Sequence, residues 1–140
     1  MDVVTPNGFD DSFLPEEDRY EELKGKARQR FREVAEALLG YKLSDDAMML
    51  AISGRYEFKN KGIDIYLKVM DQLNQCETCQ RELVSFILVP ANNYGPGRAL
   101  AERLYNNSDK EVSESFLTHG LHDQDYDAIL NSIKNTSIGN

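Results

Sequence analysis

The chain has no tryptophan and only two cysteines among its 140 residues. That cysteine content is far below the density of a secreted, disulfide-stapled domain, so reduced thiols are expected. No run approaches the roughly 18 apolar residues that a membrane-spanning helix needs. The first residues, MDVVTPNGFDDSF, also lack the basic and apolar segments of a secretion signal. These absences predict an intracellular, cytoplasmic protein with no membrane partner, and they leave a nuclear or viral setting open.

The composition is that of a folded acidic domain. Hydrophobic residues make up 41% and charged residues 29% of the chain, and the net charge is −8. A chain of this length buries about two-thirds of its unfolded surface, which is enough for a hydrophobic core. The charge is unevenly distributed, because residues 1–23 hold eight acids and one base, whereas residues 24–61 hold nine bases and five acids. The middle segment is therefore the only basic one.

Apolar spacing and helix-stop signals predict an all-α fold. A stripe of apolar residues at three-and-four spacing in residues 14–40, ended by Gly40, predicts a long helix. Similar patterns predict shorter helices elsewhere, over residues 43–54, 62–73, 76–89, 97–107, 109–120 and 123–134. The expected architecture is a compact bundle of five to six short helices. Residues 1–13 are expected to be a mobile acidic N-terminal arm, and residues 14–140 a single helical domain.

The soft metal ligands of the chain form two pairs with equal spacing. Cys76 and Cys79 are three positions apart, as are His119 and His122. Two thiolates and two imidazoles are a ligand set that tetrahedral zinc accepts, and residues three apart at a helix end can converge on one ion. If the fold brings the pairs together, the four residues would hold one structural Zn²⁺. No other cofactor is indicated.

Two other interpretations of these residues stay open. The cysteines fall on the apolar stripe of the helix predicted over residues 76–89, where cysteine acts as a small hydrophobic residue. His119 next to Gly120 suits a helix C-terminus, where a positive charge is favourable. Alternatively, Cys76 and Cys79 could be the pair of a thiol redox enzyme, although the βαβ context typical of thioredoxin-like proteins is not predicted.

The basic segment has a structural and a binding interpretation. Its cations are Lys24, Lys26, Arg28, Arg30 and Arg32. They could pair with acids of their own helix, as Glu22 with Lys26 would. They could also contact nucleic acid or an acidic protein.

No catalytic constellation emerges from the sequence. We therefore expect a non-enzymatic helical module that binds a protein partner as an adaptor, regulator or assembly factor, with a possible structural zinc and possible homo-oligomerisation. The alternatives are a nucleic-acid-associated protein that uses residues 24–32, and the thiol redox enzyme.

Overall fold

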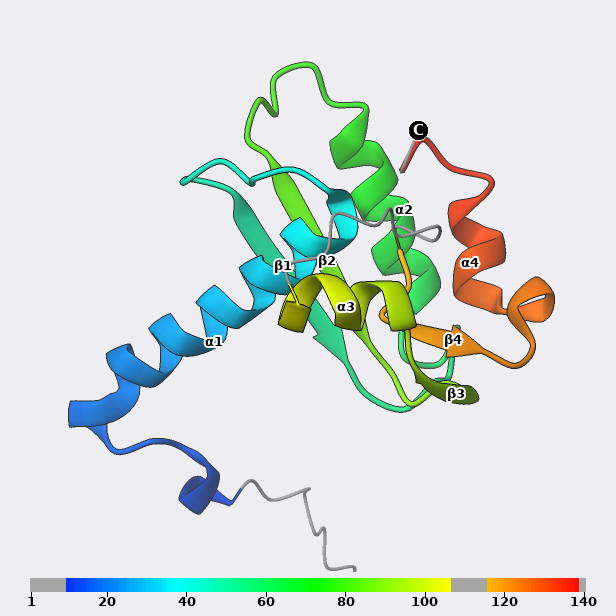
Figure 1. Cartoon of the computed structure of the whole chain (residues 1–140). Coiled ribbons are helices and arrows are strands. Elements are labelled where there is room, and N and C mark those ends of the chain that lie inside the picture. Colours follow the sequence, from blue (N-terminus) through cyan, green and yellow to red (C-terminus); the bar gives the residue numbers. More distant parts are fainter. Residues whose placement is uncertain (1–9, 107–115, 139–140) are drawn as a thin grey trace, which may run out of the picture.

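The computed structural model describes residues 10–106 and 116–138 (Figure 1). These residues form four α-helices, four short strands and two 3-10 turns, Asp11–Phe13 and Gln124–Tyr126. The helices and strands, in chain order, are α1 Glu17–Leu39, β1 Met48–Ser53, α2 Ile63–Asn74, β2 Leu83–Leu88, β3 Asn93–Pro96, α3 Arg98–Asn106, β4 His119–Leu121 and α4 Ala128–Ile133.

The centre of the fold is a β1–α2–β2 unit. The two strands pair in parallel, from Met48 opposite Leu83 to Ser53 opposite Leu88. Parallel neighbours need a long crossover connection, and here α2 supplies it. Both strands therefore end at the same edge of the sheet, where the chain continues into residues 54–62 after β1 and residues 89–92 after β2.

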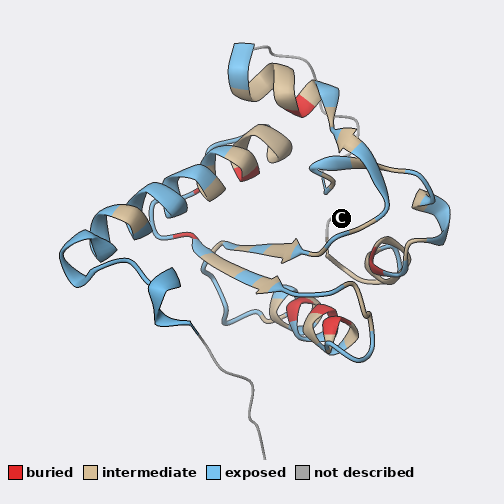
Figure 2. Cartoon of the chain, turned by 90° about the horizontal axis from the view of Figure 1, so that it is seen from below, coloured by how far each residue is buried: buried red, intermediate tan, exposed pale blue. Residues whose placement is uncertain are grey.

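Helices cover both faces of this sheet (Figure 2). On one face, Ala35 of α1 packs with Leu43 and Ala47, and Val84 and Phe86 of β2 lie against them. On the other face, α2 and α4 contribute a second buried cluster, which Ile87 of β2 contacts. Neighbouring residues of a strand point to opposite faces, so β2 serves both clusters at once. Members of the second cluster and the apolar residues packed on it are Ile63, Leu67, Ile129, Ile52, Tyr56, Phe58, Ile87, Val89 and Ile133.

Helix α1 is packed at its C-terminal half only. Gly40 ends it in the left-handed conformation with φ of 79°, and its amide donates to the carbonyl of Glu36. The other half extends away from the sheet (Figures 1 and 2), and Tyr20 and Ala27 are exposed there. The stripe predicted along the whole of residues 14–40 is therefore buried over part of its length.

The prediction of an all-α bundle of five to six helices is wrong. Residues 48–53, placed in a helix by the sequence, form β1, and residues 83–88 form β2. These runs are short and apolar, a pattern that a buried strand shares with a buried helix. Each strand is stabilised by its partner rather than by its own sequence. The result is a mixed α/β fold with two small sheets.

Other elements follow the sequence more closely. Three predicted helices are present, as α1, α2 and α3, where the sequence predicted them over 14–40, 62–73 and 97–107. The helix predicted over 123–134 is shorter than expected, because a 3-10 turn comes first and α4 begins only at Ala128. The helix predicted over 109–120 falls mostly outside the described residues, and its end forms β4, which pairs antiparallel with β3.

Residues 1–9 of the predicted N-terminal arm also lie outside the described part, while Asp11–Phe13 form a 3-10 turn. Within residues 10–106 and 116–138, no helix is long and apolar enough to cross a bilayer.

Candidate functional site

The cysteines do not begin a helix, contrary to the prediction. They lie in the turn between α2 and β2, where the Cys79 amide donates to the Cys76 carbonyl over 3.0 Å. Both thiols are free, with their sulfur atoms 2.7 Å apart. Hydrogen bonds from Cys79 and then Thr78 lower the pKa of Cys76 to about 7. Helix α2 ends at Asn74, two residues before Cys76.

The histidines lie at the other end of β2. His119 belongs to β4 opposite Pro96, and the His122 amide donates to the carbonyl of Asn92, four residues beyond β2. Figure 1 places the turn before β2 at the top of the view and β4 near the bottom. Six strand residues span roughly 17 Å, whereas zinc ligands lie about 2.0–2.3 Å from the ion. The structure therefore does not bring Cys76 and Cys79 together with His119 and His122.

No other metal cluster replaces this set. Over the described residues, no three or more His, Cys, Asp or Glu side chains are placed to hold an ion. The structural zinc predicted from the sequence thus finds no support in the geometry, and metal content stays an untested prediction.

The basic segment lies on α1 and is largely engaged by the chain itself. Arg28 donates to the carbonyl of Ala47, and Arg32 donates to the carbonyls of Leu43 and Ser44, so both fasten the connection between α1 and β1. Lys26 pairs with Glu22 as the helical spacing predicted. The remaining ion pairs are Lys24 with Glu21, Arg30 with Glu33 and Arg32 with Glu36. Nucleic-acid or protein binding through these residues stays a prediction.

A second group of cations lies at the carboxyl end of β1. Residues 54–62, which we call the basic loop, read GRYEFKNKG and contain Arg55, Lys59 and Lys61. All three are exposed, and the Arg55 side chain, 78% exposed, carries an ion pair with Glu57. The loop ends at Gly62, which takes φ of 68° and begins α2. Three positively charged residues therefore lie in the loop that leads into the positive end of a helix dipole.

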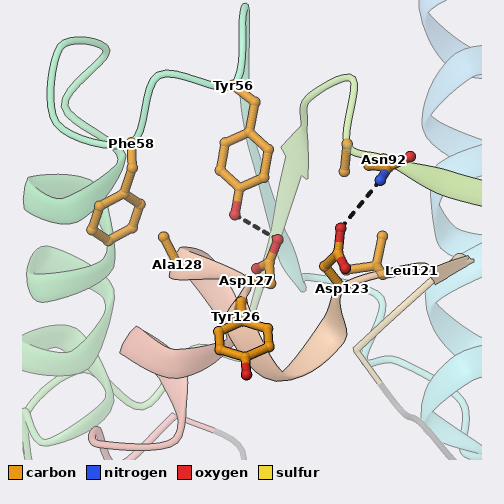
Figure 3. Close-up of a pocket in the computed structure, with 9 residues that line it drawn as sticks. Tyr56, Phe58, Asn92, Leu121, Asp123, Tyr126, Asp127 and Ala128 are labelled. Carbon is orange, nitrogen blue, oxygen red and sulfur yellow. Dashed lines mark hydrogen bonds between the residues drawn. The ribbon is translucent and has the colours of Figure 1, made fainter.

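Aromatic residues alternate with these charges and hold the basic loop in place. Tyr56 and Phe58 are part-buried against the cluster that joins α2 to α4. The Tyr56 hydroxyl donates to Asp127 Oδ2 over 2.6 Å (Figure 3). It also accepts from the Ile129 amide. Burial, followed by the Asp127 carboxylate, raises the pKa of Tyr56 to about 12. The loop is thus anchored from inside while its cations face solvent.

Next to the basic loop is an open pocket of about 340 Å³. Tyr56 and Phe58 form one wall, and Asn92, which follows β2, forms part of the opposite one (Figure 3). The Asn92 amide donates to Asp123 Oδ2 over 3.3 Å. The remaining wall comes from the segment leading into α4, with the lining residues Leu121, Asp123, Tyr126, Asp127 and Ala128.

This arrangement defines a class of protein. In α/β domains, ligands bind in the crevice outside the carboxyl ends of parallel strands, and phosphate groups favour helix N-termini. Here the carboxyl ends of β1 and β2, the start of α2, three cations and a pocket occur together. These are the features with which α/β domains bind phosphate-bearing ligands.

Sequence comparisons name the family. The family model described as glycogen synthase matches residues 1–96. Liver glycogen [starch] synthases of Rattus norvegicus and Homo sapiens are 30% and 29% identical in alignments of 117 positions that cover 75% of this chain. Isoform 2 of Saccharomyces cerevisiae is 36% identical over 52 residues, or 35% of the chain and 7% of that protein. The chain belongs to the glycogen synthase family, and it spans 17% of the length of the liver enzymes.

Family membership corrects the functional prediction. The relatives are named as synthases, so the expectation of a non-enzymatic adaptor, regulator or assembly factor is wrong, as is the statement that the chain is not an enzyme. The same finding contradicts a thiol redox enzyme or a nucleic-acid-associated protein as the function of the chain, while binding of a partner at residues 24–32 stays untested.

The sequence contained a signal for the basic loop. The first half of a βαβ unit typically reads as an apolar run, then a loop, then an amphipathic helix. Residues 48–74 follow this order, and their loop contains Gly54, three cations and Gly62. Residues 48–53 were assigned to a helix, so the loop was not recognised as the end of a strand.

Proposed function

We propose that this chain is part of a glycogen synthase, a glycosyltransferase, and that its basic loop binds the anionic leaving group of the glycosyl donor. The observation that carries the proposal is the position of Arg55, Lys59 and Lys61 between the end of β1 and the start of α2, in a chain of this family. Glycosyltransferase activity is inferred from the relatives, and the region that matches this chain is about one-sixth of their length.

Glycosyl transfer explains why cations are needed there. The bond between the sugar's anomeric carbon and the donor's leaving group breaks, and a bond to an acceptor hydroxyl forms while that hydroxyl loses its proton. Negative charge then develops on the leaving group, which in an activated sugar is a phosphate or diphosphate. Fixed cations and helix N–H groups stabilise such charge most where it develops. Arg55 suits this role because its planar guanidinium can bind two phosphate oxygens.

The pocket supplies groups for the sugar. Its walls combine Phe58 and Tyr126, whose rings can lie against a sugar face, with Asn92 and Asp123, whose polar atoms can bind hydroxyls (Figure 3). The hydrogen bond from Tyr56 to Asp127 fixes the wall that also carries the cations. A donor could therefore place its sugar in the pocket while its phosphate meets the basic loop.

The test is a binding titration of the chain with glucose 1-phosphate and with nucleoside diphosphate glucoses. Variants Arg55→Ala and Lys61→Ala are compared with Lys68→Ala, which removes an exposed cation further along α2. A charge-assisted contact contributes about 1.5–3 kcal/mol, so each loop variant should weaken binding by roughly tenfold or more.

Lys68→Ala should bind as the unaltered chain does. Loop variants with unchanged affinity, or an equal loss in Lys68→Ala, would contradict the assignment. Transfer of labelled glucose to a glycogen primer by the intact protein, with the same variants, separates donor binding from catalysis.

A further inference from the structure

The turn between α2 and β2 has the backbone geometry that a short disulfide needs. The hydrogen bond from the Cys79 amide to the Cys76 carbonyl closes a four-residue turn with the sequence CETC. Such a turn holds the first and fourth Cα atoms within about 7 Å of one another. Disulfide-bonded cysteines have Cα atoms about 4.4–6.8 Å apart. The turn can therefore accept the bond without rearrangement of the backbone around it.

The side chains are already directed at one another. The two sulfur atoms are 2.7 Å apart, and Thr78 Oγ1 lies 3.3 Å from the Cys76 sulfur. Cys79 is exposed and Cys76 is partly exposed, so a small reagent can reach both. Neither thiol belongs to the hydrophobic clusters on the two faces of the sheet.

Cys76 is the more acidic of the two thiols, and a two-step exchange requires one thiol that reacts first and a second that closes the disulfide. The hydrogen bond from Cys79, with help from Thr78, lowers the pKa of Cys76 to about 7, so a large fraction is thiolate at neutral pH. The pKa of Cys79 is raised, chiefly by its interaction with Cys76. The thiolate is the attacking species in thiol–disulfide exchange. Cys76 is thus the first nucleophile, and Cys79 is held beside it as the resolving thiol.

We propose that Cys76 and Cys79 are a site of reversible oxidation, converted to an intramolecular disulfide by exchange with a small-molecule disulfide. The Cys76 thiolate attacks one sulfur of the reagent, and one small thiolate leaves. Cys79 then loses its proton and attacks the Cys76 sulfur of the mixed disulfide, which releases the second small thiolate. The chain loses two electrons and two protons in total, and the reagent is reduced to two thiols. The chain is the substrate of this thiol–disulfide exchange and does not act as its catalyst.

The position of the turn predicts what oxidation leaves unchanged. On the α2 side, Asn74 donates to the Ser137 carbonyl over 2.9 Å, and on the β2 side, Glu82 accepts from the Ser44 amide over 2.7 Å. Both ends of the turn are therefore fixed independently of the thiols. The basic loop lies at the opposite end of β2, as does the pocket, so donor binding should not change. Failure of this proposal is consequently distinguishable from failure of the proposed function.

The experiment treats the reduced chain with oxidised glutathione at neutral pH. We expect a mass lower by two hydrogen atoms, loss of both titratable thiols together, a monomer on a non-reducing gel, and full recovery with dithiothreitol. In Cys79→Ser the reaction should stop at one stable glutathione adduct on Cys76. In Cys76→Ser the adduct should form several-fold more slowly, because the remaining thiol, Cys79, has no lowered pKa and an ordinary thiol is mostly protonated at neutral pH.

Three results would overturn the proposal. One is an unaltered chain that accumulates two glutathione adducts without closing the ring. A second is a chain joined into disulfide-linked dimers, and the third is a chain that keeps both thiols under conditions that oxidise dithiothreitol completely.

Discussion

Tyr56 Oη lies 2.6 Å from Asp127 Oδ2, and this hydrogen bond joins the basic loop to the start of α4 across 71 positions of the sequence. The same hydroxyl accepts from the Ile129 amide, while Asp127 Oδ1 caps α4 by accepting from the Leu130 amide over 2.9 Å. The pair of Tyr56 and Asp127 therefore fastens the basic loop and also caps the N-terminus of α4. The loop that it fastens also carries Arg55, Lys59 and Lys61.

Tyr56→Phe should destabilise the chain by about 2 kcal/mol, because a hydrogen bond to a charged group is lost and the Ile129 amide is left without its acceptor. Urea denaturation followed by circular dichroism measures the change. Tyr126→Phe is the control, since Tyr126 is 88% exposed, and it should stay within about 0.5 kcal/mol of the unaltered chain. Equal effects of the two substitutions would show that the hydroxyl of Tyr56 has no special role.

The same tyrosine should make stability fall at high pH. Burial and the Asp127 carboxylate raise the pKa of Tyr56 to about 12, against about 10 in an unfolded chain. A raised folded-state pKa gives a contribution that is fully present below pH 10 and is lost as the pH rises from about 10 through 12. Phenolate absorbance should show a late-titrating component among the seven tyrosines. That component should be absent from Tyr56→Phe, and its persistence there would assign it to another tyrosine.

Two glycines of α1 should respond oppositely to the same substitution. Gly25 lies inside the helix, with no atom within 4 Å of an added Cβ, so Gly25→Ala should stabilise the chain by about 0.5–1 kcal/mol. Gly40 ends the helix at φ of 79°, where a side chain costs about 1–2 kcal/mol, so Gly40→Ala should destabilise it. Thermal unfolding of both variants is the measurement. A gain in Gly40→Ala would mean that the helix does not end in the left-handed conformation.

Arg32 should matter more to folding than its neighbours in the basic segment. Its side chain is part-buried, at 16% exposure, and donates to the carbonyls of Leu43 and Ser44 over 2.9 and 2.8 Å. Arg32→Ala should cost about 2 kcal/mol, and Arg32→Lys should recover little because lysine lacks the planar fork. Lys26→Ala, which removes an exposed ion pair, should cost less than about 0.5 kcal/mol. A Lys26→Ala variant as unstable as Arg32→Ala would refute this division.

The part of the fold that depends on local sequence could be predicted. Helix α1 shows a long apolar stripe with a glycine stop, and α2 places Ile63, Leu67 and Met70 on one buried face. The strands could not be predicted in the same way. Residues 48–53 read MMLAIS, rich in good helix formers, and they are a strand because β2 pairs with them from 35 positions away.

The site was hidden by the same error. Once residues 48–53 are assigned to a helix, Arg55 and Lys61 belong to an ambiguous loop, and no strand end exists at which to place them. By contrast, equal spacing made Cys76, Cys79, His119 and His122 conspicuous. Spacing carries no information on which end of a strand each pair occupies, and β2 separates them. The pairing of β1 with β2, which joins distant segments, therefore explains both errors. It creates the strand end at which the basic loop lies, and it keeps the cysteines and the histidines apart.

The most direct test of the donor-binding account is an amide chemical-shift map of the isotopically labelled chain during titration with glucose 1-phosphate. The account predicts that the largest shifts fall on residues 54–66, which form the basic loop and the first turn of α2, with smaller shifts at Asn92 and Asp123 in the pocket. Shifts confined to α1 around residues 24–32, or an unchanged spectrum at saturating ligand, would contradict it.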